Sequence, residues 1–314
     1  MNIAGAVEKC LSDFNIRDKL RFVVTDNASN MRKAFEVLAA MTAEEATEPP
    51  ELSVLDDDSL WEDMQPSDEE HVNAAMCRTG VKRLSCFAHT LQLVIKDGVE
   101  KLGAGRTLIS KCCKMANLVH QSIAFREEFE KMFGNSASIP STNASRWNSL
   151  FMQLTSISDL DSQKLANLLM QTSHDKLILT KKESDMLDEL VDILAPFAEA
   201  TDLTQGDKFT TIGCVVPTVV ALMKHLTSLL DRASYHRPLV TALHASMLVR
   251  FEGLLVNLQM VPQPAGQENL PFDAQIYLIA TALDPSWGFR WLECDHPGTE
   301  DVKICLKAAI ISEF

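Results

Sequence analysis

The chain has 314 residues, of which 46% are hydrophobic and 23% charged, a balance typical of a folded globular protein with one large domain or two smaller ones. Its formal net charge of −14 argues against a uniformly basic, nucleic-acid-binding surface. No apolar run approaches the roughly 20 residues of a membrane span, so we expect no membrane partner. The first residues lack the apolar core of a signal peptide, and the eight cysteines are scattered without a disulfide-like pattern, so we expect an intracellular location.

The first predicted elements surround Asp26. Residues 3–14 carry apolar side chains at helical spacing, and Phe22–Val24 is an apolar, β-branched run that predicts a short buried strand. Residues 27–40 return to helical spacing, so Asp26 falls at the carboxyl end of a strand, where α/β sheets bind their ligands. Asp26 is therefore either a ligand-binding carboxylate or a turn and cap residue, and Asn27 can also cap the following helix.

Most of the acidity lies in the next segment. Residues 42–71 hold 12 acidic residues and no Lys or Arg, whereas the rest of the chain has 29 positive against 31 negative residues. We predict a disordered acidic surface loop at 42–71, in which Leu60 and Trp61 either contact a protein partner or form a solvated turn. The remaining, nearly neutral chain does not by itself predict strong DNA binding.

Helical pattern resumes after this loop. Cys86 and His89 precede a helical stripe of Leu91, Val94 and Ile95. Structural zinc needs four ligands, and this pair supplies two, so a buried cysteine and a hydrogen-bonded core histidine are favoured over a metal site.

A further helix is predicted over residues 106–133, with Ile123 on its apolar face, and it ends at Gly134. A polar stretch then leads to Arg146 and Trp147. These two residues are interpreted either as a nucleic-acid contact or as a tryptophan packed between helices beside an arginine paired to a carboxylate.

The rest of the chain reads as almost wholly helical. Thr180–Glu183 is a capping box whose helix should kink or break at Pro196. A buried helix is predicted for Ile212–Leu230, and another begins with Pro238 in its first turn. We therefore expect an α/β fold with a large all-α insertion, mostly helical overall. We predict two domains: a partial α/β core at residues 1–150 and the helical insertion at residues 151–314.

Three motifs along the chain carry a resemblance. They are Val-Val-Thr-Asp-Asn-Ala-Ser-Asn-Met with Asp26, Asn27 and Asn30, the Cys-x-x-His pair Cys86 and His89, and Ser-Arg-Trp-Asn-Ser with Arg146 and Trp147. In this order they resemble the motifs of hAT-family DNA transposases and of the zinc-finger BED-domain proteins descended from them. Among the latter, the resemblance is to type-4-like members. The segment 275–285 is similar to the family's Ala-x-x-Leu-Asp-Pro box.

The resemblance implies a ribonuclease-H-like core whose Asp-Asp-Glu triad holds two divalent metal ions. Asp26 would be the middle member, and Arg146 and Trp147 would lie close to DNA. Cys86 and His89 would brace the strand-to-helix corner near the acidic site.

The first aspartate, the final glutamate, the BED zinc finger and the dimerisation segment have no recognisable counterpart in this chain. Two Mg²⁺ or Mn²⁺ ions about 3.5–4 Å apart normally need three carboxylates, and Asp26 alone cannot hold such a pair. We therefore expect a vestigial site that binds no metal cofactor unless the triad is completed outside this chain.

The function expected from this reading is that of a domesticated or truncated hAT-transposase-like protein without catalytic activity. It would act in the nucleus in association with DNA or in transcription regulation. Two alternatives stay open. The first is a fragment of an active, metal-dependent transposase. The second is an interaction scaffold that recruits proteins through the helical insertion and the acidic loop.

Overall fold

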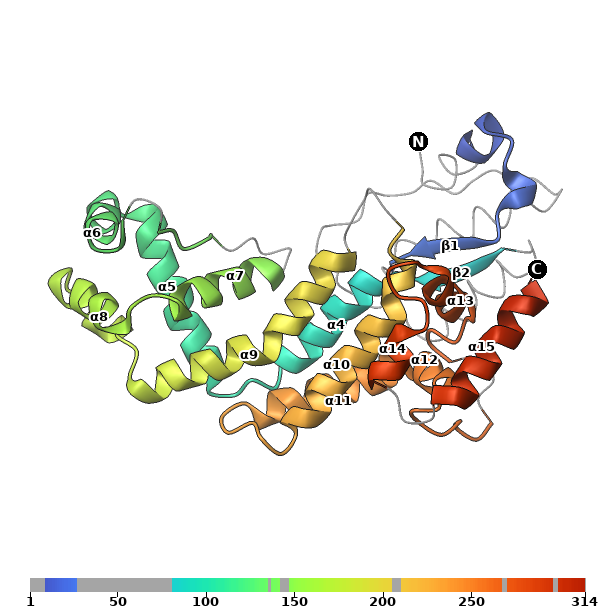
Figure 1. Ribbon diagram of the computed structural model, residues 1–314. Coiled ribbons are helices and arrows are strands. Elements are labelled where there is room, and N and C mark those ends of the chain that lie inside the picture. Colours follow the sequence, from blue (N-terminus) through green and yellow to red (C-terminus); the bar gives the residue numbers. More distant parts are fainter. Residues whose placement is uncertain are drawn as a thin grey trace. The chain divides into compact units, whose positions relative to one another are not determined.

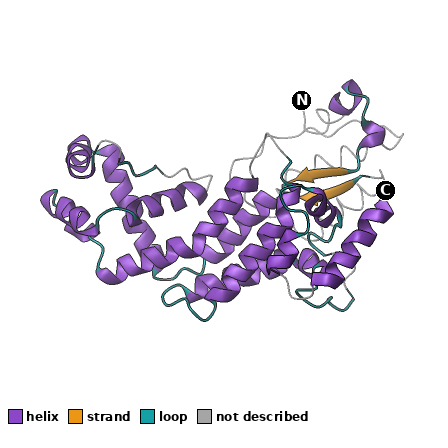
Figure 2. Ribbon diagram, viewed as in Figure 1, coloured by secondary structure: helices purple, strands orange, loops and turns teal. Residues whose placement is uncertain are grey.

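The computed structural model describes most of the predicted helical region and the strands around Asp26. The described residues are 9–26, 81–134, 137–141, 147–204, 210–266, 270–295 and 299–313. The helix expected at 27–40 and the acidic loop at 42–71 lie outside these residues, as does the first part of the helix expected at 3–14, of which residues 9–13 are helical. The described chain is mostly helical with one small sheet, which confirms the predicted fold class (Figure 2).

The chain divides into two compact units, residues 1–90 and 91–314, and each is described by itself. The domain boundary expected at residue 150 stays a prediction. Figure 1 labels the elements, which are η1 (Arg17–Lys19), β1 (Phe22–Thr25), β2 (Lys82–Ser85), α4 (Phe87–Val99), α5 (Gly105–Gln121), α6 (Ile123–Phe133), α7 (Trp147–Ser158), α8 (Ser162–Gln171), η3 (Asp175–Leu177), α9 (Lys181–Thr204), η4 (Ile212–Cys214), α10 (Val215–Leu229), α11 (Arg237–Arg250), α12 (Glu252–Asn257), α13 (Ile276–Leu283), α14 (Arg290–Asp295) and α15 (Thr299–Glu313).

The sheet of the described residues consists of β1 and β2, which pair in parallel with Phe22 opposite Lys82 and Thr25 opposite Ser85. The predicted strand is therefore confirmed, but it is not buried throughout. Val24 is 59% exposed, whereas Thr25 is buried. Successive side chains point to opposite faces of a strand, so these two neighbours meet different surroundings and only one of them is covered.

The helix expected over 106–133 is in fact two helices, α5 and α6, separated by Ser122. Ser122 has an extended backbone (φ −107°, ψ 110°), and its Oγ accepts a hydrogen bond from the Phe125 amide at 3.3 Å. A serine in this position competes with the helical hydrogen bonds and starts a new helix. Ile123, expected on the apolar face, is consequently 74% exposed. The helix α6 ends before Gly134, as predicted, and Gly134 has a positive φ of 88°.

The capping box at the start of α9 is confirmed. The Thr180 amide donates to Glu183 Oε2 at 2.9 Å, and the Glu183 amide donates to Thr180 Oγ1 at 3.2 Å.

The sequence predicted a kink or a break at Pro196. The helix does not break there: α9 continues without interruption to Thr204. Proline removes one helical amide, so a carbonyl about one turn earlier loses its partner. The carbonyl concerned is that of Asp192, and His225 Nε2 of α10 lies 3.2 Å from the carbonyl of the neighbouring Ile193, close enough to donate a hydrogen bond to it. The buried side chains Phe197 and Ala198, which follow the proline directly, hold the helix in the core.

The most buried described helix of the second unit is α10, preceded by η4. The segment Ile212–Leu229 is 18 residues long with a mean hydropathy of 1.5, so it is long and apolar enough to cross a membrane, contrary to our expectation from the sequence. Within the protein, 61% of this segment is buried, as in the core helix of a folded domain. The next helix, α11, has Pro238 in its first turn as predicted and ends at Arg250.

Candidate functional site

Asp26 directly follows β1, at the carboxyl end of the parallel pair. Arg83, on the neighbouring strand, holds the main chain at this corner: its Nε donates to Thr25 Oγ1 at 2.9 Å and its Nη2 donates to the Asp26 carbonyl at 3.1 Å. A guanidinium group is always charged and presents its donors in a rigid fork, so it fixes the end of β1 and brings a permanent positive charge to the corner.

The Asp26 side chain is half-buried, and its Oδ1 atom is buried without a hydrogen-bond partner. Such an oxygen calls for a donor or a cation. Within the described ranges, however, no three His, Cys, Asp or Glu side chains come together as a metal site. Among the described residues at this corner, Asp26 stands beside the Arg83 guanidinium, whereas the resemblance implies a two-metal centre there. Asn27 and Asn30 lie outside the described residues.

Cys86 and His89 lie at the turn from β2 into α4. The Cys86 amide donates to the Thr25 carbonyl at 2.7 Å, which extends the parallel pairing by one residue. The Cys86 carbonyl in turn accepts from Thr90 Oγ1 at 3.0 Å, one turn into α4. The Cys86 thiol is free, and the His89 side chain is half-buried. The main-chain hydrogen bonds of Cys86 therefore place this residue, and with it the start of the helix that carries His89, next to the end of β1.

Trp147 opens α7 in the second unit. Its ring lies 6.0 Å from that of Phe151, while its indole Nε1 is buried without a hydrogen-bond partner. The adjacent Asn148 donates to Asp202 Oδ1 at 3.0 Å and so ties α7 to α9, but its own Oδ1 is also buried and unpartnered. Arg146 lies outside the described residues.

Gln153, two turns further along α7, was not singled out from the sequence. Its side chain is only 1% exposed, and its Nε2 donates to the Pro140 carbonyl at 3.0 Å, yet its Oε1 has no partner. Buried polar atoms are nearly always paired, so three unpaired ones on a single helix are unusual and distinguish α7 among the described helices. The sequence could have drawn attention to Gln153, because this glutamine occupies a position of the helical pattern that is otherwise apolar.

The Leu-Asp-Pro segment has a packing role in this structure. Thr281 Oγ1 donates to the Gly213 carbonyl at 2.9 Å, and Asp284 Oδ1 accepts from the Ser286 amide at 2.8 Å. Gly213 is so close to Asp284 that an added Cβ would lie 2.7 Å from Asp284 Oδ2. The segment therefore joins α13 to η4 rather than contributing a reactive group.

The cysteines whose side chains the structure describes are free thiols, and the most buried of them is Cys112 in α5. Burial, followed by the neighbouring Cys113 and the Glu183 carboxylate, raises the pKa of Cys112 to about 12. It therefore stays a neutral thiol at physiological pH, which suits a core residue and not a nucleophile.

In a comparison with protein families, residues 84–193 match the family model described as ZBED1 RNase-like helical domain. The matched range begins in β2, ends inside α9 and includes Cys86, His89 and Trp147, whereas Asp26 precedes it. No curated protein matches the chain. The family match supports a ZBED/hAT-like origin for this chain.

Proposed function

We propose that this chain is a domesticated or truncated hAT-transposase-like protein that does not cleave DNA and acts in the nucleus as a DNA-associated or transcription-regulatory protein. The match to the ZBED1 RNase-like helical domain supports the transposase-derived origin. The observation that carries the loss of catalysis is the contact of Arg83 with the main chain of Asp26.

A catalytic aspartate in a two-metal site has to collect divalent cations. Here a guanidinium is hydrogen-bonded to both Thr25 and Asp26, so a fixed positive charge occupies the same corner. Like charges at short range in a partly buried site repel, which raises the cost of binding metal ions there. One hydrogen-bond donor is enough to satisfy the buried Asp26 Oδ1, and it brings no further positive charge to the corner, whereas a pair of cations does.

The proposed DNA contact lies on α7. The Trp147 side chain is half-buried, and the accessible part of its ring offers a surface on which a base can stack. This arrangement supports a contact with nucleic acid near Trp147, as the family resemblance implies.

The Trp147→Phe variant tests the DNA role because it replaces the indole with a smaller aromatic ring that offers less stacking surface. We expect about threefold to tenfold weaker binding of a fluorescein-labelled duplex, measured by anisotropy at low salt, since part of the base-stacking surface is lost. Trp291→Phe is the matched control: the Trp291 side chain is 5% exposed and offers no face to a base, so binding should not change. Equal binding by wild type and Trp147→Phe would overturn the assigned contact.

Titration calorimetry with Mn²⁺ distinguishes the proposal from the active-fragment alternative. We expect no heat of binding that depends on Asp26, so wild type and Asp26→Asn should give the same trace. A binding isotherm that is present in the wild type and lost in Asp26→Asn would show a surviving metal site and favour the alternative.

A further inference from the structure

The helix α5 differs in charge from the protein as a whole. Between Glu100 and Glu127 the chain has five Lys or Arg residues and no Asp or Glu, although the protein has a net charge of −14. Three of these five cations belong to α5, which contains no carboxylate. An acidic protein therefore carries a locally basic helix.

One face of α5 is buried and the other is exposed to solvent. The buried hydrophobic residues of the helix are Leu108, Cys112, Met115, Ala116 and Val119. The exposed residues that recur every three or four positions, and so share one face, are Arg106, Ser110, Lys114, Asn117 and Gln121. We call these five residues the α5 face. It presents two cations and three uncharged hydrogen-bonding groups, with no apolar or acidic side chain among them.

The cations of the α5 face are not neutralised by ion pairs. Neither Arg106 nor Lys114 forms an ion pair with a described carboxylate, whereas the half-buried Lys111 is paired with Glu183 at 2.6 Å. The Arg106 Nη2 atom donates to the Glu100 carbonyl at 2.7 Å, which holds the guanidinium near the start of the helix. Lys114 lies two turns further on, about 12 Å along a helix axis.

Arg126 of α6 brings positive charge to the other end of α5. Its Nε donates to the Val119 carbonyl at 2.9 Å, and its Nη2 donates to the His120 carbonyl at 2.7 Å. These carbonyls lie in the last turn of α5, where a helix carries a partial negative charge that a guanidinium offsets. The short helix η3, which also packs against α5, adds one charge of each sign, Asp175 and Lys176.

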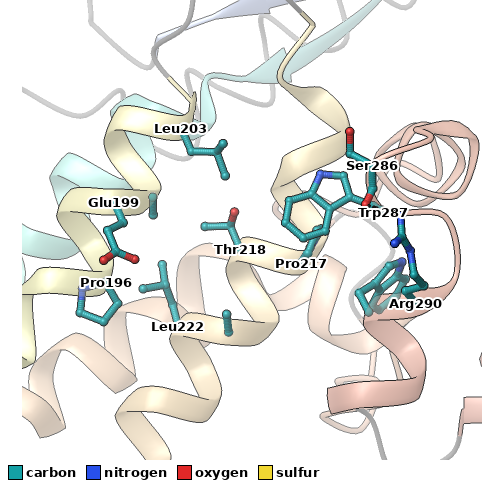
Figure 3. Close-up of a pocket in the computed structure, with 12 residues that line it drawn as sticks. Pro196, Glu199, Leu203, Pro217, Thr218, Leu222, Ser286, Trp287 and Arg290 are labelled. Carbon is teal, nitrogen blue, oxygen red and sulfur yellow. Dashed lines mark hydrogen bonds between the residues drawn. The ribbon is translucent and has the colours of Figure 1, made fainter.

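Other surfaces of the same unit have a different charge. From Glu183 to its end, α9 carries seven Asp or Glu residues and no Lys or Arg. A pocket between α9, α10 and the turn into α14 is lined by Glu199, Arg290 and Trp287, so it has charges of both signs (Figure 3). The helix α7, which carries Trp147 and packs against α5, has no charged residue. Of these surfaces, the α5 face is the one with positive charge alone.

We propose that the α5 face binds the phosphate backbone of duplex DNA, with Arg106 and Lys114 against phosphate oxygens. The argument is charge complementarity, and Ser110, Asn117 and Gln121 can donate to phosphate or sugar oxygens between the cations. The acidic α9 repels the same polyanion, which favours an approach from the side of α5. A bilayer is disfavoured because the face has no apolar side chain to enter it. The inference rests on the proposed DNA association and adds to it a contact without base specificity.

The salt dependence of DNA binding tests the α5 face. A fluorescein-labelled duplex is titrated by anisotropy at several KCl concentrations, and the slope of log affinity against log salt reports the number of phosphates neutralised. We expect Lys114→Gln to weaken binding about threefold to fivefold at low salt and to reduce the slope by about 1, equally for unrelated duplex sequences. The double variant Arg106→Gln/Lys114→Gln should reduce the slope by about 2.

Lys181→Gln is the matched control. It removes the same charge, but Lys181 lies on the acidic α9 and is paired with Asp185 at 2.7 Å, so the slope should not change. Circular dichroism identifies a misfolded variant. Lys114 is exposed and makes no hydrogen bond or ion pair with a described residue, so the fold of Lys114→Gln is expected to persist.

A slope that folded Lys114→Gln and the double variant change no more than Lys181→Gln does would overturn the proposal. If Trp147→Phe still weakens duplex binding in that case, the proposed DNA association stands without the α5 face. If the wild type binds no duplex at low salt, both fall. Loss of binding to phosphatidylserine vesicles in Lys114→Gln, with duplex affinity retained, would assign the face to lipid and would also overturn the proposal.

Discussion

Asp97 on α4 and Arg250 at the end of α11 are joined through a single carboxylate oxygen: the Nε and Nη2 atoms of Arg250 both lie 3.1 Å from Asp97 Oδ2. Ser246 Oγ, one turn earlier on α11, donates to the same oxygen at 2.6 Å. The three groups connect two helices that are far apart in the sequence. Because the Asp97 side chain is 39% exposed, solvent screens part of this interaction.

Asp97→Ala should lower the free energy of unfolding by about 1–2 kcal/mol, because Ser246 and Arg250 lose their shared acceptor. Urea denaturation measures the change. A double-mutant cycle with Arg250→Ala should give a coupling energy of about 0.5–1 kcal/mol. Strict additivity of the two substitutions would show that the contact contributes nothing.

Glu189 on α9 caps the loop between α10 and α11. Its carboxylate accepts the main-chain amides of Ser234 and Tyr235, each at 2.8 Å, and of His236 at 2.7 Å. Glu189→Ala should cost about 2 kcal/mol of unfolding free energy, and Glu189→Gln should cost less because the amide oxygen still accepts.

Hydrogen exchange of these three amides gives the local readout for Glu189. We expect faster exchange at Ser234, Tyr235 and His236 in Glu189→Ala, with little change in α5. Unchanged protection of the three amides in the folded variant would contradict the capping role.

Glu183 makes part of the stability dependent on pH. Burial raises its pKa, but the hydrogen bond from Lys111, at 2.6 Å, and those from Thr180 outweigh burial, so the pKa of Glu183 in the folded protein lies below its ordinary value of 4.5. A lowered carboxyl pKa stabilises the folded state fully above the unfolded-state value and loses that contribution as the pH falls through the folded-state value.

The difference in unfolding free energy between wild type and Glu183→Gln should therefore be largest near neutral pH and shrink below about pH 4.5. Urea denaturation across this range measures it, and Glu127→Gln, an exposed carboxylate on α6, serves as the comparison. A difference that stays constant with pH would show that the ionised Glu183 carboxylate contributes nothing.

Gly213 leaves little room for a side chain, because an added Cβ would lie 2.7 Å from Asp284 Oδ2 and 3.3 Å from the Ala280 carbonyl. We expect Gly213→Ala to lower the unfolding free energy by about 1–3 kcal/mol through overpacking. Asp284→Ala in the Gly213→Ala background should recover part of the loss, as measured by thermal unfolding. No recovery in the double variant would place the strain elsewhere.

Local sequence rules predicted the elements whose ends depend on neighbouring residues. The capping box of Thr180 and Glu183, the positive-φ end at Gly134 and the first-turn position of Pro238 all follow from chemistry within a few residues. For the same reason the apolar, β-branched run Phe22–Val24 located β1, and Asp26 directly follows that strand.

Tertiary contacts decided what the sequence did not reveal. Pro196 remains inside α9 where His225 of α10 lies beside a helix carbonyl and buried neighbours hold the chain, and none of this is visible locally. Arg83 reaches Thr25 across 58 residues, so its place beside Asp26 could not be read from spacing. The pocket with Glu199 and Trp287 likewise joins segments that only folding brings together.

The most direct measurement is a nicking assay on supercoiled plasmid DNA with Mg²⁺ or Mn²⁺, using the wild type and Asp26→Ala prepared in parallel. We expect both proteins to leave the plasmid as intact as the protein-free control, because Asp26 shares its corner with the Arg83 guanidinium. Metal-dependent nicking by the wild type that disappears in Asp26→Ala would contradict the proposed loss of catalysis and restore this aspartate as a working metal ligand.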